Sequence, residues 1–194
     1  LQSALINSMR KLIADGDTRC QRWCTLTVAN LALRKENHRF LLENKSVESL
    51  LLPLINSNDV ETHRGVSFAL HSFSRHEENH SVLEDTLLRI IEALVLLARS
   101  SDRDTALQAC LATKYLCGCK PNCRIIFVQS HGLEPLLMQA SKSDDLETIT
   151  EVCAALQNIS LSDQNKEEMM NKSGMIDILC KLARDQNNEL AHQA

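Results

Sequence analysis

Apolar residues recur along this chain in blocks with helical spacing, and short polar stretches separate the blocks. One block places apolar or small residues around Asn158, at Val152, Cys153, Ala155, Leu156 and Ile159. An equivalent block surrounds Ser72, at Val66, Ser67, Ala69, Leu70 and Phe73. Residues with this spacing share one stripe of a helix with 3.6 residues per turn. The pattern therefore predicts amphipathic helices, each with one buried stripe.

The blocks repeat at a fixed period. An asparagine follows each long block, at Asn37, Asn79, Asn122 and Asn165, with spacings of 42, 43 and 43 residues. A second set of positions inside the blocks has the same spacings, and we call its members the register residues: Asn30, Ser72, Tyr115 and Asn158. Two independent landmarks with one period indicate a tandem repeat. One unit cannot bury its apolar stripe alone, so neighbouring units must stack.

Each unit contains enough apolar blocks for a short first helix, a middle helix and a longer third helix that carries the register residue. Polar breaks follow the middle helices at Ser57-Asn58-Asp59, Ser100-Ser101-Asp102, Ser143-Asp144-Asp145 and Asp185-Gln186-Asn187. Gly132 and Gly174 lie where a first helix must end and the chain must turn. Because glycine tolerates positive φ, we expect left-handed backbone at both positions.

The period divides the single domain, residues 1–194, into a partial unit (1–36), three complete units (37–78, 79–121 and 122–164) and a second partial unit (165–194). Leu5–Ala14 would be the middle helix of the first partial unit, and the chain would end a few residues into a third helix. Neither end carries the polar helix that caps a solenoid. We therefore expect a fragment of a longer array.

Composition narrows the fold class and the range of partners. Aromatic residues make up only 3% of the chain and there are five glycines, while Leu, Ala, Glu and Lys are abundant, which favours an all-α fold. The net charge of −4 comes from interspersed charges, so nothing supports binding to nucleic acid or to an anionic membrane surface. No apolar run approaches the roughly 18 residues of a membrane span, and no direct membrane insertion is expected.

The N-terminal sequence lacks the features of a secretory signal. We therefore expect an intracellular, cytoplasmic protein with reduced thiols. A nuclear location, or a membrane tether outside this chain, remains open.

Three short motifs resemble those of armadillo repeats. They are the third-helix ending Ala155-Leu156-Gln157-Asn158-Ile159, the N-x-x-x-[FIM] that follows it, and the turn Gly132-Leu133-Glu134-Pro135-Leu136. The resemblance covers essentially the whole chain. HEAT repeats have a similar length, but they are two-helix units that usually lack the Asn-bearing third helix. The resemblance implies a right-handed superhelical solenoid of about four three-helix repeats.

The resemblance also implies a binding site. In armadillo proteins the third helices line a concave groove that holds an extended peptide, and the register Asn pairs with the peptide backbone through its amide donor and acceptor. Only Asn30 and Asn158 keep that residue, whereas Ser72 and Tyr115 depart from it. A net hydrogen bond contributes only about 0.5–1.5 kcal/mol, so side-chain pockets must supply further affinity.

Neighbouring positions suggest a groove of mixed character. Grooves of the importin-α type carry Trp four residues before the register Asn, where this chain has Leu26, Phe68, Leu111 and Ala154, which argues against a receptor for nuclear-localisation signals. Trp23 lies off that ladder, and we expect it to pack near the first repeat junction. Catenin-like grooves use basic residues, for which the candidates are Arg34, His71, Arg75 and Lys114. The expected peptide-binding residues are Asn30, Arg34, Phe68, Ser72, Arg75, Leu111, Tyr115 and Asn158.

No catalytic, cofactor-binding or metal-binding motif is evident. Phosphate-cradle, nucleophile-elbow and H-E-x-x-H patterns are missing. Cys117, Cys119 and Cys123 cluster, but each aligns with an ordinary junction position of the other units, and a structural zinc site usually needs four ligands. We therefore expect neither metal nor cofactor.

The expected function is a non-catalytic scaffold or adaptor that binds an extended segment of a protein partner in the groove. Two alternatives remain open. One is the regulatory armadillo portion of a larger enzyme, of the ubiquitin-ligase or NAD-hydrolase type. The other is a structural subunit of a cytoskeletal or axonemal assembly. The residues do not identify the partner or the oligomeric state.

Overall fold

The computed structural model describes residues 2–184, and this part of the chain consists of helices and turns without a β-strand. The α-helices are α1 (Gln2–Ala14), α2 (Thr18–Ala32), α3 (His38–Glu43), α4 (Val60–Ser74), α5 (Leu87–Ala98), α6 (Arg103–Cys119), α7 (Pro121–Gln129), α8 (Leu133–Lys142), α9 (Leu146–Ser160), α10 (Asp163–Asn171) and α11 (Met175–Arg184). The all-α prediction is confirmed.

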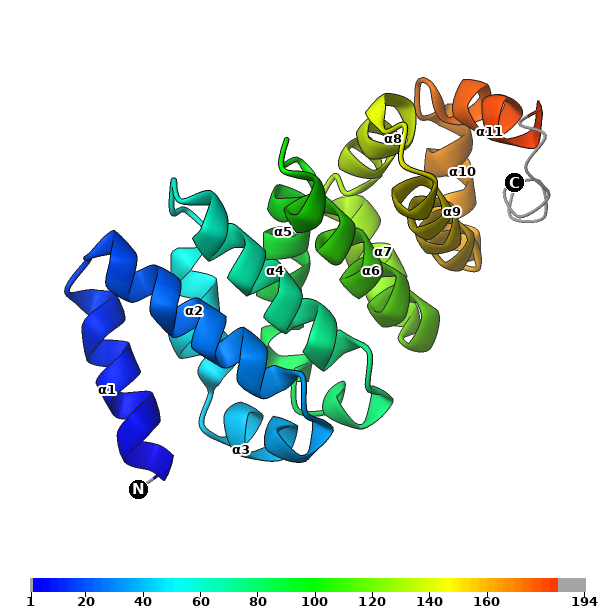
Figure 1. The fold of residues 1–194 in the computed structure, drawn as a ribbon. Helices are drawn as coiled ribbons and strands as arrows, with labels where there is room; N and C mark the ends of the chain where they lie inside the picture. Colours follow the sequence, from blue (N-terminus) through cyan, green and yellow to red (C-terminus); the bar gives the residue numbers. More distant parts are fainter. Residues whose placement is uncertain (1, 185–194) are drawn as a thin grey trace.

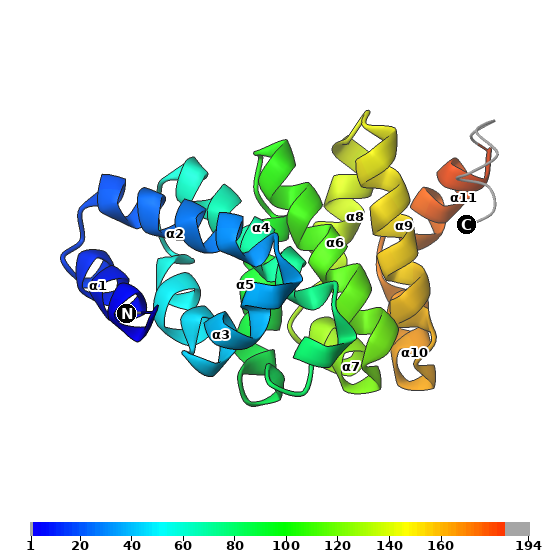
Figure 2. The ribbon, with the colours of Figure 1, turned by 60° about the horizontal axis from the view of Figure 1, so that its bottom comes forward.

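The third helices of successive units, α2, α4, α6 and α9, pack side by side in one layer (Figure 1). The first and second helices form a second layer, in which α5, α7 and α8 pack against the third helices, and the third helices keep the same order after rotation (Figure 2). Helices α1 and α11 lie at opposite ends of the row. The fold is therefore an elongated solenoid in which each unit packs on the next.

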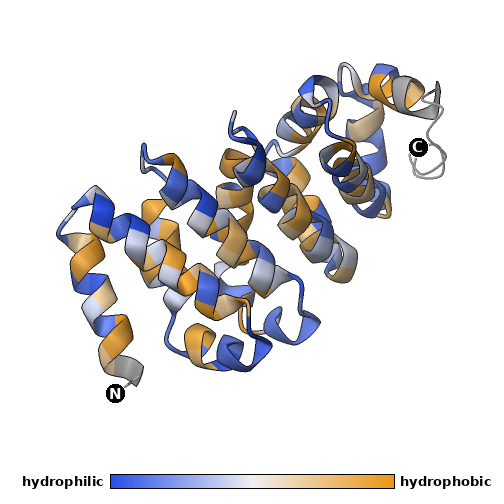
Figure 3. Cartoon of the chain, in the orientation of Figure 1, coloured by the Kyte–Doolittle hydropathy of each residue, from blue (hydrophilic) through white to orange (hydrophobic). Residues whose placement is uncertain are grey.

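Buried side chains connect the units into one apolar layer that runs from Ile6 in α1 to Met175 in α11. Every member of the two predicted stripes, around Ser72 and around Asn158, is buried. Figure 3 shows hydrophobic patches repeating along the helices and hydrophilic turns between them. The periodic pattern thus identified the buried face correctly.

Two predicted helices take irregular forms. The first helix of the second unit is replaced by two short 3-10 helices, Glu77–Asn79 and Glu84–Thr86. The middle helix of the first unit is a π-helical turn, Val47–Leu51, followed by a 3-10 helix, Leu52–Leu54. Pro53 lacks the N–H that a regular α-helix needs there. The expected short first helix and middle helix are therefore formed by 3-10 and π-helical segments at these two places.

The turn after the first helix corrects one glycine prediction. Gly174 has φ +82°, as expected, but Gly132 has φ −72° and the preceding His131 takes the left-handed conformation with φ +61°. Gly132 is needed for a different reason, because a Cβ there would lie 2.3 Å from the Phe127 ring. Steric contact, and not backbone handedness, selects glycine at position 132.

Trp23 also differs from its sequence-based prediction, because 66% of its side chain is exposed instead of packed at a junction. The third helix predicted near the C-terminal end, together with the break Asp185-Gln186-Asn187, lies outside the described residues. Within residues 2–184, no helix is both long enough and apolar enough to cross a bilayer.

Candidate functional site

The third helices α4, α6 and α9 start in the same way. Their N-cap residues Asp59, Asp102 and Asp145 each accept hydrogen bonds from the backbone N–H and the side-chain hydroxyl of the threonine three residues later. The threonines are Thr62, Thr105 and Thr148, and all three are buried. Side-chain oxygens at N-caps satisfy backbone donors that otherwise lack a partner. The S-x-D-x-x-T pattern in the three polar breaks is therefore a helix-start signal.

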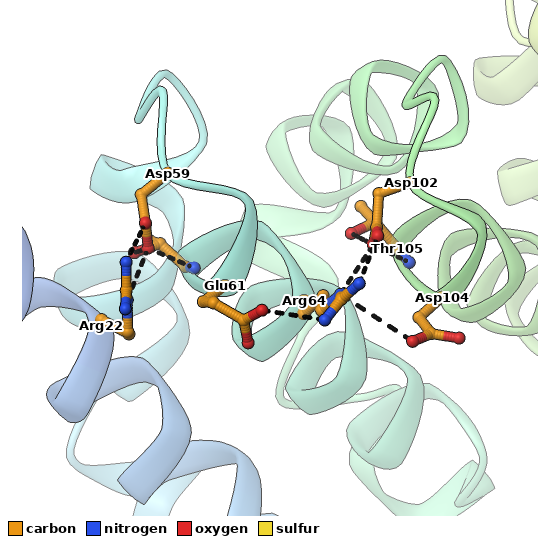
Figure 4. A network of polar contacts seen from close by, with 8 residues as sticks. Arg22, Asp59, Glu61, Arg64, Asp102, Asp104 and Thr105 are labelled. Carbon is orange, nitrogen blue, oxygen red and sulfur yellow. Dashed lines mark hydrogen bonds and ion pairs between the residues drawn. The ribbon is translucent and has the colours of Figure 1, made fainter.

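The same aspartates tie each third helix to the one before it. Arg64 on α4 makes two hydrogen bonds to Asp102 of α6, from Nε at 3.0 Å and from Nη2 at 2.6 Å. Arg22 on α2 binds Asp59 in the same forked manner (Figure 4), and Arg103 on α6 lies 2.7 Å from Asp145. The Arg22 guanidinium lowers the pKa of Asp59 to about 2. We call these three pairs the Arg–Asp ladder.

The C-terminal ends of the third helices are held by the landmark asparagines. Asn37, Asn79 and Asn165 each donate an Nδ2 hydrogen bond to the backbone oxygen six residues earlier, at 2.9–3.2 Å. Asn79 also contacts His38 Nδ1 of the preceding unit at 2.8 Å. Side-chain hydrogen bonds thus hold both ends of α4 and α9 and the C-terminal end of α2, and these helices present the side chains that lie between their ends.

These supports present one surface, which we call the third-helix face. It consists of the register residues together with the positions seven and four residues before them and three residues after them. The added residues are Trp23, Gly65, Gln108 and Glu151, then Leu26, Phe68, Leu111 and Ala154, then Leu33, Arg75, Gly118 and Leu161. Of the eight predicted binding residues, Asn30, Arg34 and Arg75 are exposed, whereas the other five are partly exposed.

A hollow of about 360 Å³ lies on this face between α2, α4 and α6. Its lining brings together Asn30 and Phe68 with residues that were not predicted from the sequence: Leu26, Ala29, Leu33, Glu61, Arg64, Gly65, Asp104 and Gln108. Gly65 lets α4 approach α2 closely, since a Cβ there would lie 2.9 Å from Thr25 Cβ. The periodicity of the exposed positions could have pointed to Leu33 and Gln108.

An aromatic cluster continues the face beyond the hollow. The rings of His71 and Tyr115 are stacked, with centroids 5.7 Å apart and planes 10° apart, and Phe68 meets His71 edge-on at 6.4 Å. His71 Nδ1 lies 2.6 Å from Gln108 Oε1, so Nδ1 is the protonated nitrogen. Burial, reinforced by the nearby positive charges, lowers the pKa of His71. The lowered pKa favours the neutral form of the ring.

Lys114 and Asn158 extend the same surface. Lys114 Nζ lies 4.7 Å from the centre of the Tyr115 ring and forms an ion pair with Glu151. Asn158 donates from Nδ2 to the backbone oxygen of Lys114 at 2.9 Å. Part of the amide expected to bind a peptide is thus used to join α9 to α6.

Residues 120–161, which comprise α7, α8 and α9, match the sequence model of the armadillo/β-catenin-like repeat. The chain has the armadillo-repeat fold. A computationally designed armadillo repeat protein for modular peptide recognition superposes with a TM-score of 0.81 at 18% identity, over 96% of this chain and 77% of the other.

Two further solved structures agree with that assignment. A designed armadillo repeat protein in complex with the peptide (KR)4 gives a TM-score of 0.79 at 19% identity, over 95% of this chain and 77% of that one. An engineered protein gives 0.80 at 23% identity, over 97% and 75%. A search among curated proteins gave no significant match. The resemblance deduced from the repeat motifs is confirmed.

The armadillo junction after α6 differs from the other junctions. Helix α6 extends to Cys119, Pro121 begins α7, and Asn122 is exposed. Arg124 binds the end of α6 instead, through hydrogen bonds from Nε to Cys117 O at 2.7 Å and from Nη2 to Gly118 O at 3.1 Å. A proline at the first helical turn and a longer third helix thus displace the asparagine from its usual place.

The cysteines at this junction differ in exposure. Cys117 and Cys123 are buried, whereas Cys119 is exposed. Burial raises the pKa of the Cys123 thiol to about 11 and also raises that of Cys117. Thiols bind metals as thiolates, so both pKa shifts oppose metal binding. Within the described part of the chain, no three His, Cys, Asp or Glu residues are placed to hold a metal ion.

Proposed function

We propose that this armadillo array is a non-catalytic interaction scaffold that binds an extended segment of a partner protein along its third-helix face. The observation that carries the proposal is the gathering of an apolar hollow, a stacked aromatic pair and two amide side chains on one rigid face. These groups offer apolar contact area together with donors and acceptors for a peptide backbone.

The structural relatives support this proposal. A computationally designed armadillo repeat protein for modular peptide recognition and a designed protein in complex with (KR)4 share the fold. The contacts within this chain add a physical reason. Asn30 and Asn158 occupy corresponding positions of two third helices, so their amides can pair with the same extended backbone. Each net hydrogen bond contributes about 0.5–1.5 kcal/mol, so the apolar contacts must supply much of the affinity.

A defined probe tests the proposal even though the natural partner is unidentified. Peptides of nine residues span roughly 30 Å when extended, and they can be selected on the folded protein from a random displayed library. The best synthetic peptide is then titrated by calorimetry. We expect Asn158→Ala combined with Tyr115→Ala to weaken binding at least tenfold, because the double variant removes an amide partner and half of the aromatic stack.

The control is Glu92→Ala on α5, an exposed position in the layer behind the third helices. This variant should bind the peptide as the unaltered protein does. If the double variant keeps its circular dichroism spectrum and also keeps full affinity, the third-helix face is not the binding site.

A further inference from the structure

The hollow between α2, α4 and α6 is apolar at one end and acidic at the other. Leu26, Ala29, Leu33 and Phe68 give it apolar walls. Leu33 is 61% exposed even though it is a large aliphatic residue at the end of α2. When a ligand covers an apolar wall that was exposed to water, the burial of that surface stabilises the complex. The volume of about 360 Å³ is at the lower end of the range for ligand pockets and can take one bulky side chain together with adjoining backbone.

The other end of the hollow carries an excess of negative charge. Arg64 is the one basic residue in the lining, and it already binds Asp102 and Glu61 at 2.6–3.0 Å. Asp104 lies farther from it, at 3.8 Å, and its side chain is 63% exposed. Three carboxylates thus surround one guanidinium (Figure 4). Asp104 is the carboxylate best placed to form an ion pair with a positively charged group of a ligand.

We propose that this hollow is the anchor subsite of the peptide-binding face and takes a leucine- or phenylalanine-sized side chain that has a lysine or arginine within two residues. The apolar side chain packs between Leu33 and Phe68, and the basic side chain pairs with Asp104. This inference rests on the proposed function. It adds a sequence preference, because both the apolar walls and the surplus negative charge must be matched by one partner segment.

The chain supplies matched controls for both contacts. Leu88 on α5 is an exposed leucine like Leu33, with 53% exposure, and it belongs neither to the hollow nor to the third-helix face. Glu147 is the repeat equivalent of Asp104 and has a 64% exposed side chain. Substitution of these exposed residues should leave the fold intact. A difference between Leu33 and Leu88, or between Asp104 and Glu147, therefore reports on the hollow itself.

Trp23 provides a local readout. It is the only tryptophan of the chain, it is 66% exposed, and it lies on α2 three residues before Leu26, which lines the hollow. Residues three apart are neighbours on a helix surface. Occupation of the hollow should change the Trp23 emission spectrum, provided that the probe peptide itself contains no tryptophan.

The experiment begins with peptides selected from the random nine-residue library. We expect enrichment of Leu, Phe or Met with Lys or Arg within two positions. For the best such peptide, Leu33→Ala should weaken binding about tenfold. Asp104→Asn should weaken it several-fold at low salt and much less at high salt, because exposed charge pairs are screened. Leu88→Ala and Glu147→Gln should have little effect, and binding should change the Trp23 emission.

The outcomes separate this inference from the proposed function. If selected peptides lack the expected pattern, or bind equally well to Leu33→Ala and Leu88→Ala, the anchor proposal is overturned. The proposed function still stands in that case if Asn158→Ala with Tyr115→Ala reduces binding. If neither set of variants reduces binding, both proposals fail.

Discussion

At the scale of single residues, the turn after each first helix shows that backbone conformation and steric contact select residues at different positions. Lys45, His131 and Gly174 adopt positive φ in three different units. Only one of them is glycine, although glycine takes this conformation at the lowest cost. At position 132 glycine is required by the Phe127 ring instead. The choice of residue therefore depends on a side chain five residues away.

Gly132→Ala should lower the free energy of unfolding by about 1–3 kcal/mol, because the new methyl group collides with a buried aromatic ring. His131→Gly should leave stability unchanged or raise it by up to about 1 kcal/mol, because it relieves a left-handed conformation. Urea unfolding followed by circular dichroism measures both. A neutral Gly132→Ala variant would show that Phe127 can move aside.

At the scale of elements, the junctions between units are the parts in which equivalent residues behave differently. Asn79 is buried and links Phe73 O at the end of α4 to His38 of the preceding unit. Asn122 is its equivalent by sequence, yet it is exposed, because α6 continues to Cys119 and Pro121 starts the next helix. The same residue type at the same repeat position thus has a structural role at Asn37, Asn79 and Asn165 but not at Asn122.

We therefore expect Asn79→Ala to destabilise the protein by about 1–3 kcal/mol, since it leaves buried polar groups without a partner. Asn122→Ala should change stability by less than about 0.5 kcal/mol, as exposed substitutions usually do. Thermal and urea unfolding of the two variants provide the comparison. Equal losses at the two positions would contradict the assigned difference between the junctions.

At the scale of the whole molecule, the most extensive contacts between helices are those between consecutive third helices. The Arg–Asp ladder links α2 to α4, α4 to α6, and α6 to α9 along one edge of the solenoid. Each aspartate also caps its own helix. One carboxylate thus fixes both the start of a helix and the spacing to its neighbour, which makes the array sensitive to carboxylate protonation.

Stability should fall as the pH drops from about 4 towards 2. The pKa of Asp59 is about 2 in the folded protein, below its ordinary value of 3.8, and the pKa values of Asp102 and Asp145 are also lowered. The unfolded chain therefore binds protons first, so this stabilisation is present above pH 4 and is lost on acidification.

Thermal midpoints measured at several pH values between 7 and 2.5 test this expectation. The double variant Asp59→Asn, Asp102→Asn should be less stable at pH 7 and should lose less stability on acidification. Asp104→Asn should keep the slope of the unaltered protein, because its carboxylate lies outside the ladder. An identical slope in the double variant would assign the acid sensitivity to other groups.

Much of the fold could be predicted because the repeat imposes the same local pattern several times. The buried stripes follow from residues such as Val66 and Ile159, which recur at helical spacing on equivalent helices. The site was predictable only in part. Asn30 and Phe68 emerged from the register, and the same period could have pointed to Leu33. Asp104 had no such signal, because its importance arises from a hollow formed by three helices.

The sequence by itself determined the period, the all-α class, the buried face of the third helices and the resemblance to armadillo repeats. These properties depend on hydrophobic burial and helical periodicity, which act locally and are written into each unit. Only the tertiary structure decided which equivalent residues play equivalent roles. In the folded protein Trp23 and Asn122 are exposed, and one N–H of Asn158 is bonded to the backbone oxygen of Lys114. The hollow also combines apolar walls with acidic residues. These outcomes depend on the distances between neighbouring helices, which the sequence pattern does not specify.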